Sequence, residues 1–156
     1  EIDTIFTPKF FDNKKKLSCI ISSMNLVKLL TVDNQSNINI FELIENFFFF
    51  LEDDTWINKL IFWELDLLKL LGYDLDLKNF VKEEIINEEK LYYVSSKNEK
   101  RYIPGFMIEK KANDVDFKQI LNGLKLISDY LEKSVLRPNN ISQPKSRIQF
   151  LNTIKN

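Results

Sequence analysis

Histidine is absent from this chain of 156 residues. It is the usual general base of enzymes and the commonest metal ligand, and many serine and cysteine nucleophiles depend on it. Glycine is scarce as well: Gly72, Gly105 and Gly123 are too few and too scattered to form a loop that cradles phosphates. The sequence therefore disfavours an enzyme, and we predict no catalytic residue.

Cysteine is limited to Cys19, so the chain cannot form an internal disulfide. This thiol lies in the apolar run 17–21, which indicates a buried structural side chain and fits a cytoplasmic protein. A structural zinc needs about four Cys, His or carboxylate ligands at close spacing. One cysteine without histidine does not supply them, and we predict no metal and no cofactor.

Long hydrophobic runs are also missing. The densest is Phe47–Leu51, which is five residues long and lies between Asn46 and Glu52. A membrane-spanning helix needs roughly 20 apolar residues. We predict no membrane segment and place these phenylalanines in a core or an interface. With 44% hydrophobic residues, the chain can bury a sizeable core.

Charge is present but unevenly distributed. The net charge is −1, made up of +2 in residues 1–32, −9 in residues 33–90 and +6 in residues 91–156. Adjacent carboxylates such as Glu83 and Glu84 lie in polar connectors, where a solvated surface explains them better than an acid and base pair. The basic C-terminal part permits a local phosphate-binding surface.

Helical spacing of apolar residues recurs along the chain. It predicts helices over about residues 13–31, 38–52, 56–71, 115–136 and 145–154. Asp12 or Asn13 can cap the first helix. Asp54 or Thr55 can cap the third, and Gly72 follows it as a left-handed terminal residue. The polar segment 33–37 separates the first two helices.

The third predicted helix is apolar on most sides, which indicates the centre of a bundle. The residues left for solvent are Asn58, Lys59, Asp66 and Lys69. Glu64 falls on the apolar stripe, where an ionised carboxylate needs a partner. We predict a structural buried acid paired with an arginine or lysine, Arg101 being one candidate; a functional acid with a shifted pKa is the alternative.

The fourth predicted helix directs an apolar face inward and is stopped by Pro138. Its inward residues are Phe117, Ile120, Leu121, Leu124, Ile127, Leu131 and Val135. Before it, residues 91–94 and 101–103 read as a β-hairpin. We predict a mainly α fold, a bundle of about five helices with a small hairpin insertion at about 91–103. Residues 1–11 are expected to be a strand leaving a preceding domain, and residues 12–156 the helical domain.

Basic residues are the remaining functional signal. Eight lie in predicted loops or near predicted helix ends: Lys97, Lys100, Arg101, Lys110, Lys111, Arg137, Lys145 and Arg147. Such positions let long side chains reach phosphates, and Tyr92, Tyr93 and Tyr102 beside them could stack on bases. We predict that this set binds DNA or an acidic peptide tail; an ordinary solvated surface is the alternative.

Residues 63–77 (WELDLLKLLGYDLDL) resemble the helix-ending signature of the bacterial RecO family, in which an apolar helix closes in Leu-Gly-Tyr/Phe before an Asp-Leu pair. Three further segments occur in the family's order: residues 92–97 (YYVSSK), 130–138 (YLEKSVLRP) and 146–151 (SRIQFL). Many members place cysteine pairs for zinc soon after the Asp-Leu element. Phe80 and Glu83 stand near that place here, so this chain resembles a zinc-free branch.

The resemblance implies the fold of the family's C-terminal helical region, the family's N-terminal OB-fold being absent from this chain. It also implies a recombination mediator that binds single- and double-stranded DNA, anneals complementary strands and pairs with RecR. Such a mediator docks on the C-terminal tail of single-stranded-DNA-binding protein (SSB), helps to load RecA, and works in the bacterial cytoplasm at the nucleoid. The alternative from another class is a helical protein-interaction module with no nucleic-acid role.

Overall fold

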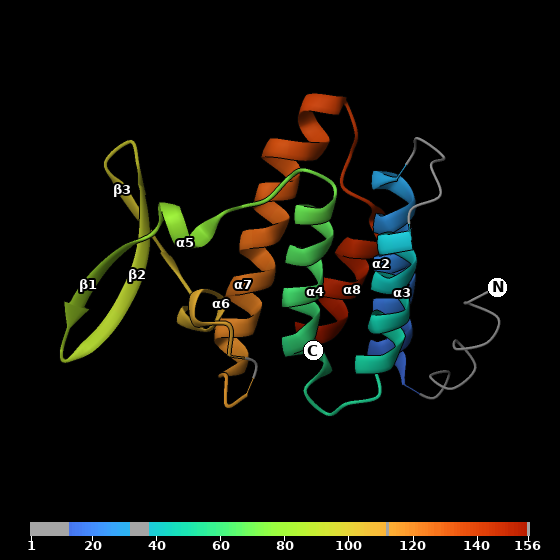
Figure 1. The fold of residues 1–156 in the computed structure, drawn as a ribbon, viewed down its shortest axis with the longest axis horizontal. Helices are drawn as coiled ribbons and strands as arrows, with labels where there is room; N and C mark the ends of the chain where they lie inside the picture. Colours follow the sequence, from blue (N-terminus) through green and yellow to red (C-terminus); the bar gives the residue numbers. More distant parts are fainter. Residues whose placement is uncertain (1–12, 32–37, 112, 156) are drawn as a thin grey trace. The chain divides into compact units, whose positions relative to one another are not determined.

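The computed structural model describes residues 13–31, 38–111 and 113–155 (Figure 1). They are mainly helical with one small antiparallel sheet, which confirms the predicted fold class. The chain divides into two compact units. The terminal unit comprises residues 1–52 and 132–156, and the central unit comprises residues 53–131. The strand predicted at 1–11 and the polar break at 33–37 lie outside the described residues.

The terminal unit contains helices α2 (Lys14–Leu30), α3 (Ile38–Phe50) and α8 (Lys145–Lys155). Asn13 caps α2, as predicted, because its side chain accepts a hydrogen bond from the backbone N–H of Lys16. Helices α2 and α8 pack together, and Asn25 Nδ2 on α2 donates to Ser146 Oγ on α8 at 3.0 Å. Cys19 is buried, as predicted.

The phenylalanine run of α3 is split by the helical turn. Phe47, Phe48 and Phe50 are buried, while Phe49 points to solvent. The Phe47 ring meets those of Phe48 and Phe50 edge to face, with centroids 5.2 and 5.4 Å apart. Edge-to-face contact is a preferred arrangement of aromatic rings. The run is therefore largely core, as expected.

The central unit begins with α4 (Trp56–Leu70), whose end matches the prediction closely. Gly72 has a φ of +89°, and the N–H groups of Gly72 and Tyr73 donate to the carbonyls of Lys69 and Leu68. This is the Schellman pattern, which satisfies the last carbonyls of a helix. It gives the Leu-Gly-Tyr step a structural role. Thr55 occupies the N-cap position, but its side chain does not make the predicted cap hydrogen bond.

Asn58 on α4 was predicted to face solvent, and this prediction is wrong. The residue is only 9% exposed. The reason is its spacing, because Asn58, Ile61 and Glu64 are separated by three residues each and share one buried face. The predicted burial of Glu64 is confirmed at 1% exposure.

After α4 the chain forms α5 (Leu77–Phe80), strands β1 (Lys82–Ile86), β2 (Glu89–Ser96) and β3 (Glu99–Ile103), and α6 (Gly105–Glu109). The sheet has the order β1-β2-β3 and is antiparallel throughout. The predicted hairpin is thus β2 and β3, and the Glu-rich segment before it adds a third strand. Each of the two turns has two residues with positive φ, Asn87 with Glu88 and Lys97 with Asn98, as tight hairpins require.

Helix α7 (Phe117–Tyr130) packs against α4 and continues as a π-helical turn, η2 (Leu131–Leu136), and a 3₁₀ turn, η3 (Arg137–Asn139). The helix predicted at 115–136 therefore begins two residues later, at Phe117, and is not uniformly α. Asp116 caps it by accepting from the N–H of Lys118. Phe117 was predicted to face inward but is 42% exposed, because it lies in the first turn, before the buried face that begins at Ile120.

Candidate nucleic-acid and peptide interface

The eight predicted basic residues are divided between the two units. In the central unit, Lys97 lies in the β2–β3 turn, Lys100 and Arg101 on β3, and Lys110 and Lys111 at the end of α6. In the terminal unit, Arg137 lies on η3, and Lys145 and Arg147 on α8. Sequence reasoning treated them as one set, whereas the structure divides them into five residues on the central unit and three on the terminal unit.

Arg147 does not have the exposure that phosphate binding requires. It is 1% exposed, although it lies near the start of α8 as expected. Lys145, two residues earlier, is exposed. Arg137 is also accessible and pairs with Glu132 at 3.5 Å. Arg147 is therefore removed from the predicted binding set, because a buried guanidinium does not reach a phosphate.

The sheet presents two different faces. Because side chains alternate along a strand, one face carries Lys82, Glu84, Ile86, Glu89, Leu91, Tyr93, Ser95, Lys100 and Tyr102; we call it the outer sheet face. The opposite face includes Tyr92 and Ile103, which are buried. Tyr92 OH donates to Glu109 on α6 at 3.4 Å. This second face is consequently the packed one.

Arg101 belongs to the packed face and is held by α7. Its Nη2 lies 2.8 Å from Asp129 Oδ2. The ion pair corrects the suggestion that Arg101 is the partner of Glu64. Both side chains of the pair remain about two-fifths exposed, so Arg101 stays accessible to solvent at the margin of the sheet.

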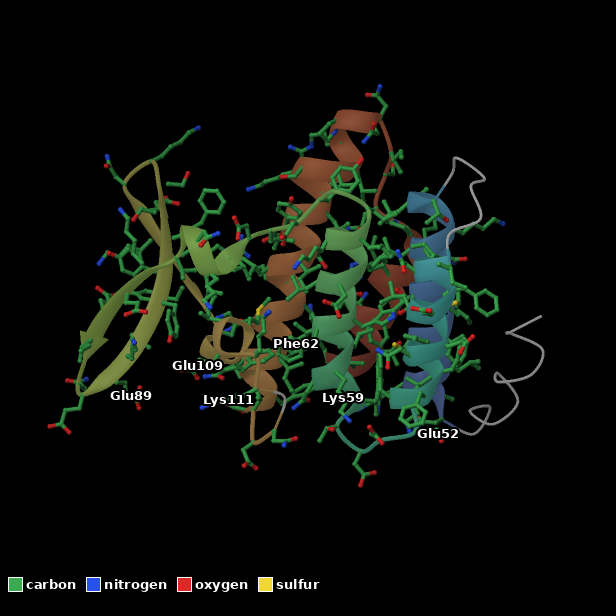
Figure 2. The ribbon with its side chains drawn as sticks, in the orientation of Figure 1. Glu52, Lys59, Phe62, Glu89, Glu109 and Lys111 are labelled. Atoms are coloured by element: carbon green, nitrogen blue, oxygen red, sulfur yellow. The ribbon has the colours of Figure 1, made fainter. Side chains whose placement is uncertain are left out.

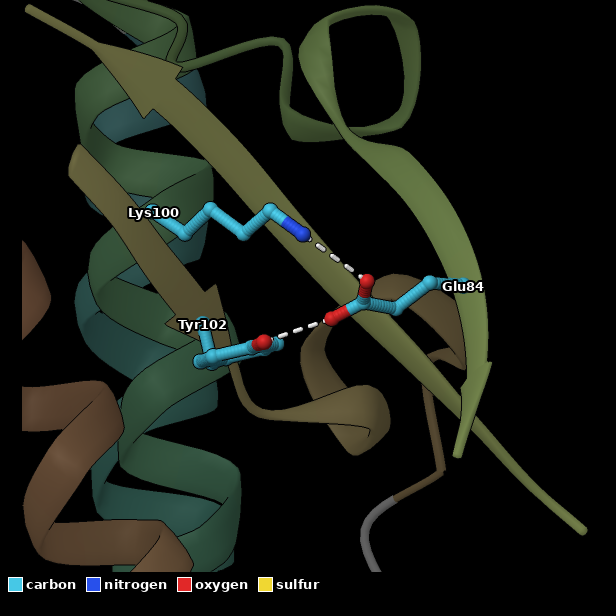
Figure 3. A network of polar contacts seen from close by, with 3 residues as sticks. All are labelled: Glu84, Lys100 and Tyr102. Carbon is cyan, nitrogen blue, oxygen red and sulfur yellow. Dashed lines mark hydrogen bonds and ion pairs between the residues drawn. The ribbon is translucent and has the colours of Figure 1, made fainter. Parts of the chain in front are cut away.

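The outer sheet face carries a network around Glu84 (Figure 3). Lys100 Nζ donates to Glu84 Oε2 at 2.9 Å, and Tyr102 OH donates to Glu84 Oε1 at 2.5 Å. These two hydrogen bonds lower the pKa of Glu84, that of Tyr102 being the larger cause. The same bonds raise the pKa of Lys100 and of Tyr102. At neutral pH the network therefore holds an ionised carboxylate beside a charged ammonium.

Two aromatic rings lie next to this network. Tyr93 and Tyr102 have centroids 6.1 Å apart, and Lys100 Nζ stands 4.6 Å from the centroid of the Tyr93 ring. The second distance is within the range of a cation–π contact. Tyr102 is 48% exposed. The outer sheet face thus combines an accessible ring with an ammonium group.

A second candidate site is a cavity of about 470 Å³ in the central unit, which we call the α4–α6 pocket. It is lined by Phe62, Leu65, Asp66, Lys69, Asp74, Leu75, Asp76, Leu77, Lys78, Asn79, Met107, Ile108 and Lys110. Phe62, which is labelled in Figure 2, is one of these lining residues. Its ring meets that of Phe106 on α6 edge to face, with centroids 5.9 Å apart. The lining combines apolar side chains with both lysines and aspartates.

Asp66 is a carboxyl group of the α4–α6 pocket whose pKa is shifted by its surroundings. Partial burial raises its pKa, and the nearby charges of Lys110 and Lys69 only partly offset this. A carboxylate with a raised pKa is held in a less polar environment than open solvent. Sequence reasoning missed this pocket, because its walls come from α4, the segment that follows it, and α6.

A zinc site of the kind expected elsewhere in the resembled family does not fit this chain. Phe80 lies at the exposed end of α5 and Glu83 on β1, and neither supplies a thiolate or imidazole. Within residues 13–31, 38–111 and 113–155 there is no group of three or more His, Cys, Asp or Glu side chains arranged to hold a metal ion. Among those same residues, no helix has the length and apolar character needed to cross a membrane.

Comparison with known proteins identifies the family of this chain. Residues 13–121 match the family model described as "Recombination protein O C terminal", which spans most of the chain from α2 into α7. The chain belongs to the RecO family. The matched span contains the outer sheet face and the α4–α6 pocket, so both candidate sites lie within the RecO region.

Curated relatives agree with this assignment. The chain is 34% identical over 111 residues to "DNA repair protein RecO" of Bartonella bacilliformis, covering 61% of this chain and 44% of the relative. It is 30% identical over 115 residues to the RecO of Bartonella tribocorum (64% and 46%) and 32% over 98 residues to that of Rickettsia canadensis (63% and 40%). The chain thus spans less than half the length of these relatives. No solved structure matches it.

Proposed function

We propose that this chain is the C-terminal part of a DNA repair and recombination mediator that binds DNA and partner proteins without catalysing a covalent reaction. The match of residues 13–121 to the RecO family is the observation that carries the proposal. Strand annealing, pairing with RecR and loading of RecA on SSB-coated DNA belong to the proposal, as does a place at the bacterial nucleoid. Annealing requires only that basic side chains offset the repulsion between two phosphate backbones.

The α4–α6 pocket supports docking of an acidic, Phe-ended tail such as that of SSB. The apolar part of its lining, which includes Phe62, Leu65 and Met107, suits contact with an aromatic side chain. Lys69, Lys78 and Lys110 supply positive charge for the tail's carboxylates. Asp66, Asp74 and Asp76 oppose them in equal number. The raised pKa of Asp66 indicates that burial makes its negative charge costly.

Opposite charge changes in the pocket are expected to move peptide affinity in opposite directions. We expect Lys110→Glu to weaken binding of an acidic, Phe-ended peptide about tenfold or more, because it replaces attraction with repulsion. Asp66→Asn is expected to strengthen binding, because it removes a negative charge. The measurement is fluorescence anisotropy with labelled peptide. Lys125→Glu, an exposed change on α7 outside the pocket, is the control. Equal weakening by Lys110→Glu and Lys125→Glu would contradict docking in the pocket.

DNA binding is proposed for the remaining basic residues: Lys97, Lys100, Arg101, Lys110, Lys111, Arg137 and Lys145. We expect the double variant Arg137→Glu, Lys145→Glu to weaken DNA binding and to reduce the salt slope by about two, since each phosphate contact contributes about 0.9. Anisotropy titrations at several salt concentrations measure both quantities. The double variant Lys14→Glu, Lys28→Glu, at exposed positions of α2, makes the same change of charge and is the matched control. A folded double variant with the original affinity and slope would favour a protein-interaction module that does not bind DNA through these residues.

A further inference from the structure

The outer sheet face holds one of the chain's own carboxylates between two hydrogen-bond donors (Figure 3). Lys100 and Tyr102 both come from β3, and they reach across β2 to the two oxygens of Glu84 on β1. One donor is an ammonium and the other a phenol, which is a strong arrangement for binding an anion. The pair is therefore an anion site whose occupant in this structure is Glu84.

A phosphodiester presents the same chemistry as this carboxylate. It carries one negative charge shared by two non-bridging oxygens, and an ammonium and a hydroxyl donor are ordinary partners for it. Lys97 lies in the turn between β2 and β3 and adds a further positive charge for a phosphate that approaches this site. A nucleic-acid phosphate could thus take the place of the Glu84 side chain without rearrangement of β3.

The tyrosine rings beside the anion site form a surface on which unpaired bases could stack. The register aligns Lys82, Tyr93 and Tyr102 in one row across the three strands. The Tyr102 ring is about half exposed, and the Tyr93 ring lies 6.1 Å from it. Stacking on aromatic side chains is how many proteins hold single strands, because every base has a π-face. In a duplex these faces are covered by neighbouring base pairs.

We propose that the outer sheet face binds single-stranded DNA, with a phosphate on Lys100 and Tyr102 and bases on the tyrosine rings, and that Glu84 occupies the phosphate site until DNA displaces it. This inference rests on the proposed function, because it names the strand type and the residues of one DNA surface. Glu84 acts in it as a competing anion that lowers affinity for the strand.

The test compares two variants that change charge equally on opposite faces of β1. Glu84→Gln removes the competing anion at nearly constant shape. Glu83→Gln removes the same charge from the other face, where Glu83 pairs with Lys90. The probe is a labelled single-stranded oligothymidine, and anisotropy is measured with the full chain at several salt concentrations. Circular dichroism confirms that each variant is folded.

We expect Glu84→Gln to tighten binding about threefold to tenfold, because the phosphate no longer has to displace a carboxylate from Lys100 and Tyr102. Glu83→Gln should change affinity less than twofold. Tyr102→Leu should weaken binding about fivefold or more with little change in slope, as expected for lost stacking. Lys100→Gln should weaken binding and flatten the slope.

The outcomes separate this inference from the function on which it rests. Equal tightening by Glu84→Gln and Glu83→Gln would overturn it in favour of a general charge effect. The inference would also be overturned if single-strand binding did not depend on Glu84, Lys100 and Tyr102, or if the variants changed duplex binding equally. In both cases a DNA-binding function would stand. Stronger binding of an acidic peptide by Glu84→Gln, without change for the oligothymidine, would assign the face to a protein partner. Absence of binding to any DNA by all forms of the chain would count against the proposed function as well.

Discussion

Replacement of Gly123 by leucine is expected to destabilise the central unit by about 3 kcal/mol, at the upper end of the usual cost of overpacking a core. Gly123 lies on α7 where that helix meets α4 and α6. A Cβ atom at this position would stand 3.1 Å from both Ile61 Cδ1 and Met107 Sδ, and 3.4 Å from Phe106 Cζ. Leucine adds three further carbons in a space that is already filled.

The alanine variant is the matched comparison at the same position. Gly123→Ala gains about 1 kcal/mol of helix propensity. That gain is opposed by the two close contacts, whose atoms are the ends of flexible side chains. We expect a net change within about 1 kcal/mol, which follows from these opposing terms. Urea denaturation followed by tryptophan fluorescence reports on this unit, because Trp56 and Trp63 both lie on α4. A leucine variant as stable as the alanine variant would contradict the close packing at Gly123.

Replacement of Arg147 by glutamate is expected to cost more than about 3 kcal/mol, as for other disrupted buried charges. Arg147 is 1% exposed, and because arginine carries a positive charge, its surroundings must accommodate that charge. Glutamate would introduce the opposite charge without access to water. A loss of DNA binding in this variant would therefore reflect unfolding rather than a lost phosphate contact.

Lys145→Glu is the control for this prediction, because it makes the same change of charge on an exposed residue of α8. Its stability should remain within about 0.5 kcal/mol of the original chain, as is usual for surface substitutions. Urea denaturation monitored by far-ultraviolet circular dichroism measures both variants. An Arg147→Glu chain with unchanged stability would show that the side chain is accessible and would return it to the proposed DNA-binding set.

The helices could be predicted because burial of one helix face makes apolar residues recur at helical spacing in the sequence. The ends of α2 and α4 also carry local signals, namely the capping Asn13 and the left-handed Gly72. Strand β1 had no such signal. Its residues Glu83 and Glu84 are typical of a polar connector, and only pairing with β2 makes them a strand.

The candidate sites were less predictable, because both depend on tertiary contacts. The α4–α6 pocket combines residues from segments that are far apart in the sequence. The pairing of Glu84 with Lys100 and Tyr102 depends on the order of three strands. The burial of Arg147 did leave a signal: Arg147, Phe150 and Ile154 follow helical spacing on one buried face of α8. The reasoning that identified Glu64 could have identified it too.

The division of the chain has a consequence for the order of folding during synthesis. The central unit is one continuous segment, so it can complete its contacts while later residues are still being translated. The terminal unit cannot, because α2 must wait for α8. The hydrogen bond from Asn25 to Ser146 spans 121 positions, and contacts between distant positions slow folding. Until α8 emerges, the apolar face of α2 lacks its native cover, and this interval is when the nascent chain is most exposed to aggregation.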